Sequence, residues 1–103
     1  MRYEWDERKN RQNQRKHGGI SFQLAALAFE DEDRLVGLDR VDEGGEQRWH
    51  LLGNAILGPG FSAVLLVVHA YREDRNGQEI IRIISARRAD KHELRRYQAQ
   101  TLD

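Results

Sequence analysis

The sequence predicts an α+β fold with two N-terminal helices, an antiparallel sheet of about four to five strands and a C-terminal helix. Three observations favour this class. Helix capping signals gather in the first 29 residues, apolar runs of strand character fill residues 34–84, and a capping box opens the final basic segment. With 103 residues, one proline and no cysteine, we expect one domain over residues 1–103, without disulfides.

The first helix is unusual because it contains no apolar residue. Tyr3 and Trp5 suggest a short initial strand, and Asp6 is suited to cap a helix that runs to His17. A helix that is polar all round gains nothing from burying a stripe, so it must be held by another element or serve as a contact surface. Gly18-Gly19 is expected just past its end.

The second helix is predicted to supply part of the core. Ser21 is a suitable N-cap, and Leu24, Leu27 and Ala28 follow at helical spacing. After an acidic run at 30–33, strands are expected over 34–39, 48–56 and 61–71, with a polar loop at 41–47 and a break at 58–60.

The Asn76-Gly77 pair predicts a two-residue type I′ hairpin turn. In that register Tyr71 faces Arg82 and His69 faces Ile84, and opposed residues share one face of the sheet. We therefore expect His69, Tyr71 and Arg82 on an open working face, with a largely apolar opposite face as the core.

The last helix is expected to begin near Lys91, because Asp90 and Glu93 have the spacing of a capping box. Arg87 and Arg88 stand just before it, where backbone N–H groups at a helix start already favour anions.

The charged residues are segregated, although the net charge is zero. Residues 1–17 carry six basic and three acidic side chains, residues 30–46 carry two and eight, and residues 82–97 carry six and two. Fourteen of the seventeen cations are arginine, whose planar fork suits phosphate. Basic ends around an acidic middle suggest a polyanion-binding patch. The alternative is that the blocks neutralise each other within the fold.

Several function classes find no support. There is no membrane-span pattern, no phosphate-binding glycine loop and no metal-ligand spacing, so we expect a cytoplasmic protein that uses neither cofactor nor metal. RNA cleavage without a metal needs a base for the 2′-hydroxyl, cations for the phosphate and an acid for the leaving oxygen.

Candidates for those roles are the histidines and arginines. His17 ends the polar helix, on one face with Lys9 and near Lys16, although a helix C-cap is the alternative role. Arg82 lies within a strand of isoleucines, so it must reach solvent or pair with a carboxylate such as Glu46 or Glu79. Arg87 and Arg88 suit a phosphate clamp or ion pairs at the helix edge. Glu46 and Arg48 form either a catalytic pair or a salt bridge.

Three segments together resemble the BrnT toxins of BrnT–BrnA type II toxin–antitoxin modules: YEWDERKNRQNQRKHGGISF, GEQRWHLLG and IIRIISARRADKHELRRY. The resemblance runs nearly end to end. It implies a RelE-like fold, a ribonuclease activity that halts translation, and a BrnA antitoxin of the ribbon-helix-helix type that carries the complex to operator DNA. Gly18-Gly19 stands where members usually have one glycine.

By position, the resemblance places His17, Glu46, Arg82 and Arg87 on family motifs, and we take these four as the catalytic candidates. The RNA-binding candidates are Lys9, Lys16, Arg48, His69, Tyr71 and Arg88. The expected function is metal-independent endoribonuclease activity, neutralised by a BrnA-type antitoxin in a hetero-oligomer. The alternative is a non-catalytic nucleic-acid-binding or operon-regulatory module.

Overall fold

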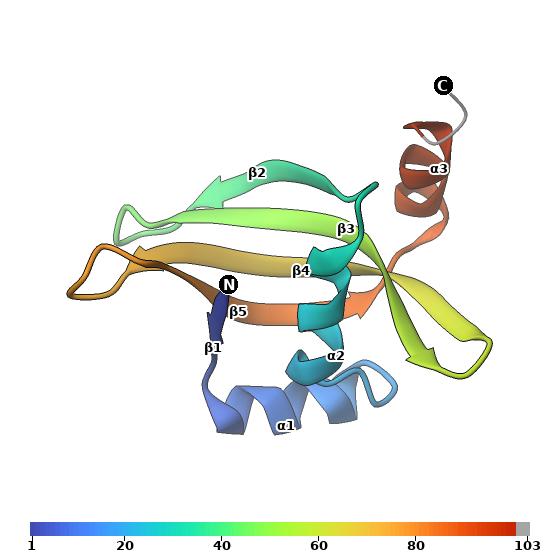
Figure 1. The fold of residues 1–103 in the computed structure, drawn as a ribbon, viewed down its shortest axis with the longest axis horizontal. Helices are drawn as coiled ribbons and strands as arrows, with labels where there is room; N and C mark the ends of the chain where they lie inside the picture. The colour runs from blue at the N-terminus through green and yellow to red at the C-terminus, as the bar shows by residue number, and fades with distance from the viewer. Residues whose placement is uncertain (101–103) are drawn as a thin grey trace.

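The computed structural model describes residues 1–100, which form one five-stranded sheet and three α-helices (Figure 1). The chain order is β1 Arg2–Glu4, α1 Glu7–Lys16, α2 Phe22–Leu27, the 3₁₀ turn η1 Ala28–Glu30, β2 Leu35–Val41, β3 Gln47–Gly58, β4 Phe61–Glu73, β5 Glu79–Arg88 and α3 Lys91–Gln100. The predicted α+β class is confirmed. Within residues 1–100, no helix has the length and apolar character that a membrane span requires.

The strand order is β1-β5-β4-β3-β2, so β1 and β2 form the two edges of the sheet. Neighbours from β2 to β5 are antiparallel, whereas the short β1 pairs with β5 in parallel. Figure 1 shows α2 crossing one face of the sheet, α1 below the β1/β5 edge, and α3 beyond the end of β5. The opposite face is called the open face below.

The core lies between α2, η1 and the sheet. Fully buried residues alternate along the strands, such as Leu65 and Val67 on β4 and Ile81 and Ile83 on β5. From the helical side, the buried residues are Phe22, Ala25, Ala28 and Phe29. The predicted core residue Leu27 is instead 42 % exposed, because the helix is short and turns its aromatic and alanine side to the sheet.

The polar helix α1 is held by two buried asparagines. The Asn13 side-chain amide donates to the carbonyls of Ile20 (2.9 Å) and Ala86 (2.7 Å), and its oxygen accepts from the Ala86 N–H (3.1 Å). The Asn10 oxygen accepts from the Phe22 N–H (2.8 Å). The Asn13 side chain thus satisfies the backbone N–H and carbonyl of Ala86 at the edge of β5, as a neighbouring strand would. These hydrogen bonds attach α1 to the sheet although the helix has no apolar residue.

The tip of the β4–β5 hairpin differs from the predicted type I′ turn. Such a turn needs a positive φ at Asn76, but within the described residues only glycines have positive φ, including Gly77 at +76°. Asp74 accepts from the Gly77 N–H through its carbonyl (3.1 Å), and its carboxylate accepts from the N–H groups of Asn76 and Gln78 (2.8 and 3.0 Å). The loop is therefore three residues long, from Arg75 to Gly77.

That extra loop residue moves the register by one between the turn and the next bulge, so each residue of β4 there is opposite the β5 residue before the predicted one. Tyr71 pairs with Ile81 and Arg82 with Ala70, and a bulge follows between Val68 and His69. The prediction of one working face for His69, Tyr71 and Arg82 is wrong. Val67, His69 and Tyr71 lie on the helix-covered side, and Arg82 lies on the open face.

Gly53 marks the closest approach of η1 to the sheet. A Cβ there would lie 2.3 Å from the Ala28 carbonyl oxygen, whereas a Cβ at Gly58 on the same strand meets nothing within 4 Å. Gly53→Ala should therefore lower the free energy of unfolding by at least about 2 kcal/mol, and Gly58→Ala should change it little. Urea denaturation of both variants measures this. Equal stabilities would contradict the packing described here.

Candidate active site

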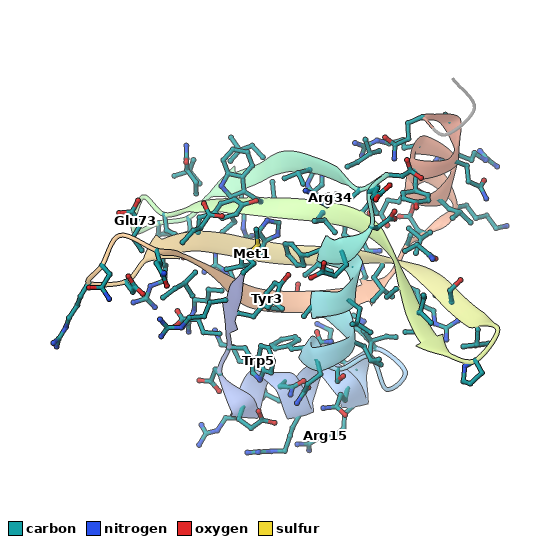
Figure 2. The ribbon with its side chains drawn as sticks, viewed as in Figure 1. Met1, Tyr3, Trp5, Arg15, Arg34 and Glu73 are labelled. Atoms are coloured by element: carbon teal, nitrogen blue, oxygen red, sulfur yellow. The ribbon has the colours of Figure 1, made fainter. Side chains whose placement is uncertain are left out.

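A shallow groove of about 250 Å³ separates α1 from the end of β5. Its lining is basic and polar, and comes from both ends of the chain: Lys9, Gln12, Asn13, Lys16, His17, Ile84 and Ser85. No carboxylate is among these residues. Arg15, another cation of α1, projects away from the sheet (Figure 2). The groove is thus a concave site that suits an anion.

His17 lines this groove, and Arg87 lies near His17 without being one of the lining residues. His17 closes α1, and its backbone N–H donates to the Asn13 carbonyl (2.8 Å), so its backbone has the predicted capping role while its side chain lines the groove. Partial burial lowers the pKa of the His17 imidazole, and the nearby charges of Lys16 and Arg87 lower it further. At neutral pH the ring is therefore predominantly a neutral base beside two cations.

Arg87 is held in a fixed orientation by Glu93. Its guanidinium forms two short bonds to the Glu93 carboxylate (2.7 and 2.9 Å) and a third to the Arg88 carbonyl (3.1 Å). These contacts raise the pKa of Arg87 and lower that of Glu93. Glu93 also accepts from the Asp90 N–H while Asp90 accepts from the Glu93 N–H, both at 2.8 Å, so the predicted capping box is confirmed.

Arg82 shares the open face with Arg87, since their partners Ala70 and Leu66 lie on the same side of β4. Four residues of strand separate those partners, roughly 13 Å at 3.3 Å per residue. The Arg82 guanidinium lies 3.6 Å from the Glu4 carboxylate, which also accepts from Arg72 at 2.8 Å. Its carboxylate partner is thus Glu4, and neither Glu46 nor Glu79. With a side chain 33 % exposed, Arg82 remains open to solvent.

His69 is placed where no RNA can reach it. It is fully buried, with its ring packed edge-on against Phe29 at 4.9 Å. Its Nδ1 lies 3.1 Å from the Val67 carbonyl, which can only accept, so Nε2 accepts from the Tyr71 hydroxyl (3.1 Å). Burial lowers the pKa of His69, which keeps the ring neutral. The expected RNA contact of His69 is therefore wrong, because the register shift puts it in the core.

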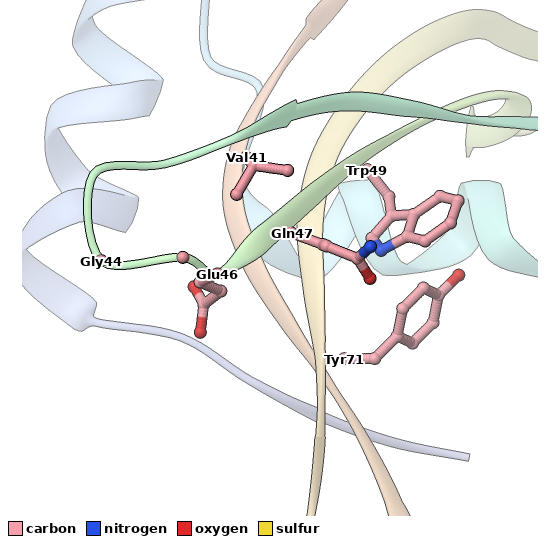
Figure 3. A pocket seen from close by; sticks show the side chains of 7 residues that line it. Val41, Gly44, Glu46, Gln47, Trp49 and Tyr71 are labelled. Atoms are coloured by element: carbon pink, nitrogen blue, oxygen red, sulfur yellow. The ribbon is translucent and has the colours of Figure 1, made fainter.

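Glu46, Arg48 and Tyr71 lie at the other end of the sheet. Arg48 pairs with Asp42 (3.3 Å) and not with Glu46, which is exposed on the β2–β3 turn. Figure 3 shows a second hollow there, with the rings of Trp49 and Tyr71 on one side and Glu46 nearer the turn. Tyr71, which lines this hollow with Glu46, is five residues along β4 from Leu66, the partner of Arg87, so roughly 17 Å of strand separates the hollow from Arg87.

The structure also brings in residues that sequence reasoning did not select. Ser85 lines the groove, Glu93 fixes Arg87, and Asn13 joins α1 to β5. The pairing of Glu93 had a local signal, since the capping box already places its carboxylate beside the N-terminus of α3. No local signal in the sequence indicated the role of Asn13, because its partner Ala86 is 73 residues away.

A small α+β fold with a groove of lysine and histidine, close to an arginine, is typical of proteins that bind polyanions. The sequence comparison specifies the family. Residues 5–93 match the family model described as the ribonuclease toxin BrnT of type II toxin–antitoxin systems, and the chain belongs to this family. A toxin of this kind acts on RNA and is paired with a protein antitoxin. Among curated proteins, no significant match was found.

Proposed function

We propose that this toxin is a metal-independent endoribonuclease whose active site is the groove between α1 and β5. Cleavage of cellular RNA there would arrest translation in the cytoplasm, and a BrnA-type ribbon-helix-helix antitoxin would neutralise it. The observation that carries the proposal is that His17 lies in this basic groove with Lys9 and Lys16, close enough to Arg87 for the arginine charge to lower its pKa. Divalent cations prefer carboxylate oxygens, and the groove offers ammonium and imidazole groups instead.

In the proposed reaction the neutral His17 imidazole takes the proton of a ribose 2′-hydroxyl. The 2′-oxygen attacks the adjacent phosphorus, the bond from phosphorus to the 5′-oxygen breaks, and that oxygen receives a proton from a Lys9 or Lys16 ammonium. The products are a 2′,3′-cyclic phosphate and a free 5′-hydroxyl. Arg87, held in place by Glu93, stabilises the charge that builds on the phosphate oxygens.

The remaining cations would position the RNA strand. Arg82 lies farther along the open face, where it would meet a different phosphate of the same strand, whereas Arg88 pairs with Leu65 and lies on the other face at the end of β5. Glu46 is too distant from the groove to share a proton transfer with His17. If the base were Glu46, Glu46→Gln would lose cleavage and His17→Gln would keep it.

Purified protein incubated with RNA in EDTA tests this function. Shortened RNA with cyclic phosphate ends supports the proposed enzyme. Intact RNA with a salt-dependent mobility shift would instead support the non-catalytic binding module, since both readings predict phosphate contacts. Cleavage that stops in EDTA and returns with Mg²⁺ would contradict metal independence.

The pH dependence of cleavage should report His17. Its pKa is lowered below the ordinary value of 6.5, so the imidazole is neutral at pH 7 and becomes protonated only as the pH falls through this lowered pKa. Protonation removes the base, and the cleavage rate should fall tenfold per pH unit on the acid side. Single-turnover rates between pH 4.5 and 8 measure this limb. A rate that stays constant over the whole range down to pH 4.5 would contradict the role of His17 as the base.

A further inference from the structure

The edge of the sheet opposite the groove carries an exposed apolar patch. Along β2, Val36, Leu38 and Val41 are 46 %, 49 % and 55 % exposed. They pair with Leu51, Trp49 and Gln47, so all three lie on the helix-covered side, beyond the reach of α2. Trp49 and Tyr71 extend this patch across β3 and β4, with ring centroids 6.0 Å apart. We call these five residues the edge patch.

The backbone of β2 is also free on its outer side. It ends the strand order, and no helix of the described chain lies along it in Figure 1. Unpaired N–H and C=O groups beside exposed apolar side chains form a template for another strand. The seven residues of β2 are enough for such pairing, although the bulge at Asp39 interrupts it.

The surroundings of the edge patch are acidic. Four carboxylates before and after β2 make no ion pair or hydrogen bond with any described residue: Glu30, Glu32, Glu43 and Glu46. The hollow between the Trp49 and Tyr71 rings and Glu46 has a volume of about 630 Å³. Aromatic faces beside a carboxylate suit a cationic side chain, and the same carboxylates repel phosphate.

We propose that the edge patch binds an extended segment of the protein antitoxin, which adds to the sheet as a strand beside β2. The segment has apolar side chains at alternate positions, packed on Val36 and Leu38, and an arginine or lysine that enters the hollow beside Glu46. The identity of the partner as the antitoxin rests on the proposed function, whereas the edge patch itself is described from the structure alone. RNA would then bind at one edge of the sheet and the antitoxin at the other.

The experiment uses the full chain and the antitoxin protein from the same operon, purified separately. Leu38→Glu should weaken their affinity at least tenfold by placing an unpaired charge in the contact, and Glu46→Lys should weaken it by a similar factor. Ile56→Glu is the matched control, because Ile56 is 69 % exposed but lies toward the far end of β3. In hydrogen exchange of the wild-type protein, the amides of residues 35–41 should become protected when the antitoxin is added.

The outcomes separate this inference from the proposed function. Leu38→Glu should cleave RNA as the wild type does, whereas His17→Ala should lose cleavage and still bind the antitoxin. Wild-type affinity in both Leu38→Glu and Glu46→Lys, or no added protection of residues 35–41, would overturn the edge proposal. The exchange measurement needs no variant, so a folding defect in either one would not leave the question open.

Discussion

Alanine at His17 or at Arg87 is expected to lower the rate of RNA cleavage by about 10²–10³-fold. His17 supplies the proposed base, and Arg87 supplies fixed positive charge where the phosphate gains charge in the transition state. Because Glu93 already holds the guanidinium by two bonds, little reorganisation is needed when the substrate binds. Single-turnover assays on a defined RNA with saturating protein measure the chemical step, and growth after induced expression gives the cellular readout.

Arg11→Ala is the control for that pair of variants. Arg11 is exposed on α1 and carries the same charge as Arg87, but unlike Arg87 it is not among the charges that lower the pKa of His17. Its loss should weaken RNA binding slightly at low salt and leave the cleavage rate near that of the wild type. Wild-type cleavage by folded His17→Ala and Arg87→Ala proteins would remove the groove as the active site.

Local signals predicted the helix boundaries of this fold well. Asp6, Ser21 and Asp90 each accept backbone N–H groups at the start of α1, α2 and α3, as their positions in the sequence indicated. These bonds join residues two or three positions apart, so the sequence alone contains both partners. Such interactions are the part of a fold that a single sequence reveals most directly.

The hairpin register failed for an equally local reason. Asn-Gly favours a two-residue loop, but Asp74 accepts two N–H groups and stabilises a three-residue loop instead. One residue of slip was enough to place Ile81 and Ile83, instead of Arg82, on the face of His69, which is therefore the core face. A site prediction that rests on strand register therefore depends on the turn more than on the strands themselves.

The site was predicted only in part, because the contacts that assemble it join residues far apart in the sequence. The sequence indicated His17 and Arg87 as separate candidates, but nothing in it placed α1 beside the end of β5. Asn13 makes that connection, through a side chain that looks like an ordinary polar residue on a polar helix. The basic and acidic segments of the chain form two surfaces at opposite edges of one sheet, the groove beside β5 and the edge patch along β2. This arrangement fits a protein with an anionic target and a separate protein partner.

Replacement of Asn13 by alanine should produce the largest loss of stability among single polar substitutions in α1. It leaves the Ala86 N–H without its acceptor and the carbonyls of Ile20 and Ala86 without a donor, at a site where Asn13 is only 5 % exposed. Each buried unsatisfied group costs about 1–3 kcal/mol, so the free energy of unfolding should fall by about 3 kcal/mol or more. Urea denaturation followed by circular dichroism measures this change.

Two further variants distinguish lost hydrogen bonds from lost helix propensity. Gln12→Ala removes a neighbouring, exposed polar side chain, and it should leave stability within about 0.5 kcal/mol of the wild type, since alanine favours helices. Asn13→Asp keeps the acceptor for the Ala86 N–H but faces two carbonyl oxygens with a carboxylate, so it should be destabilised although it is nearly the same size. If Asn13→Ala and Gln12→Ala unfold at the same urea concentration, α1 must be held by contacts other than the β5 edge, and the groove would lose the element that brings His17 to Arg87.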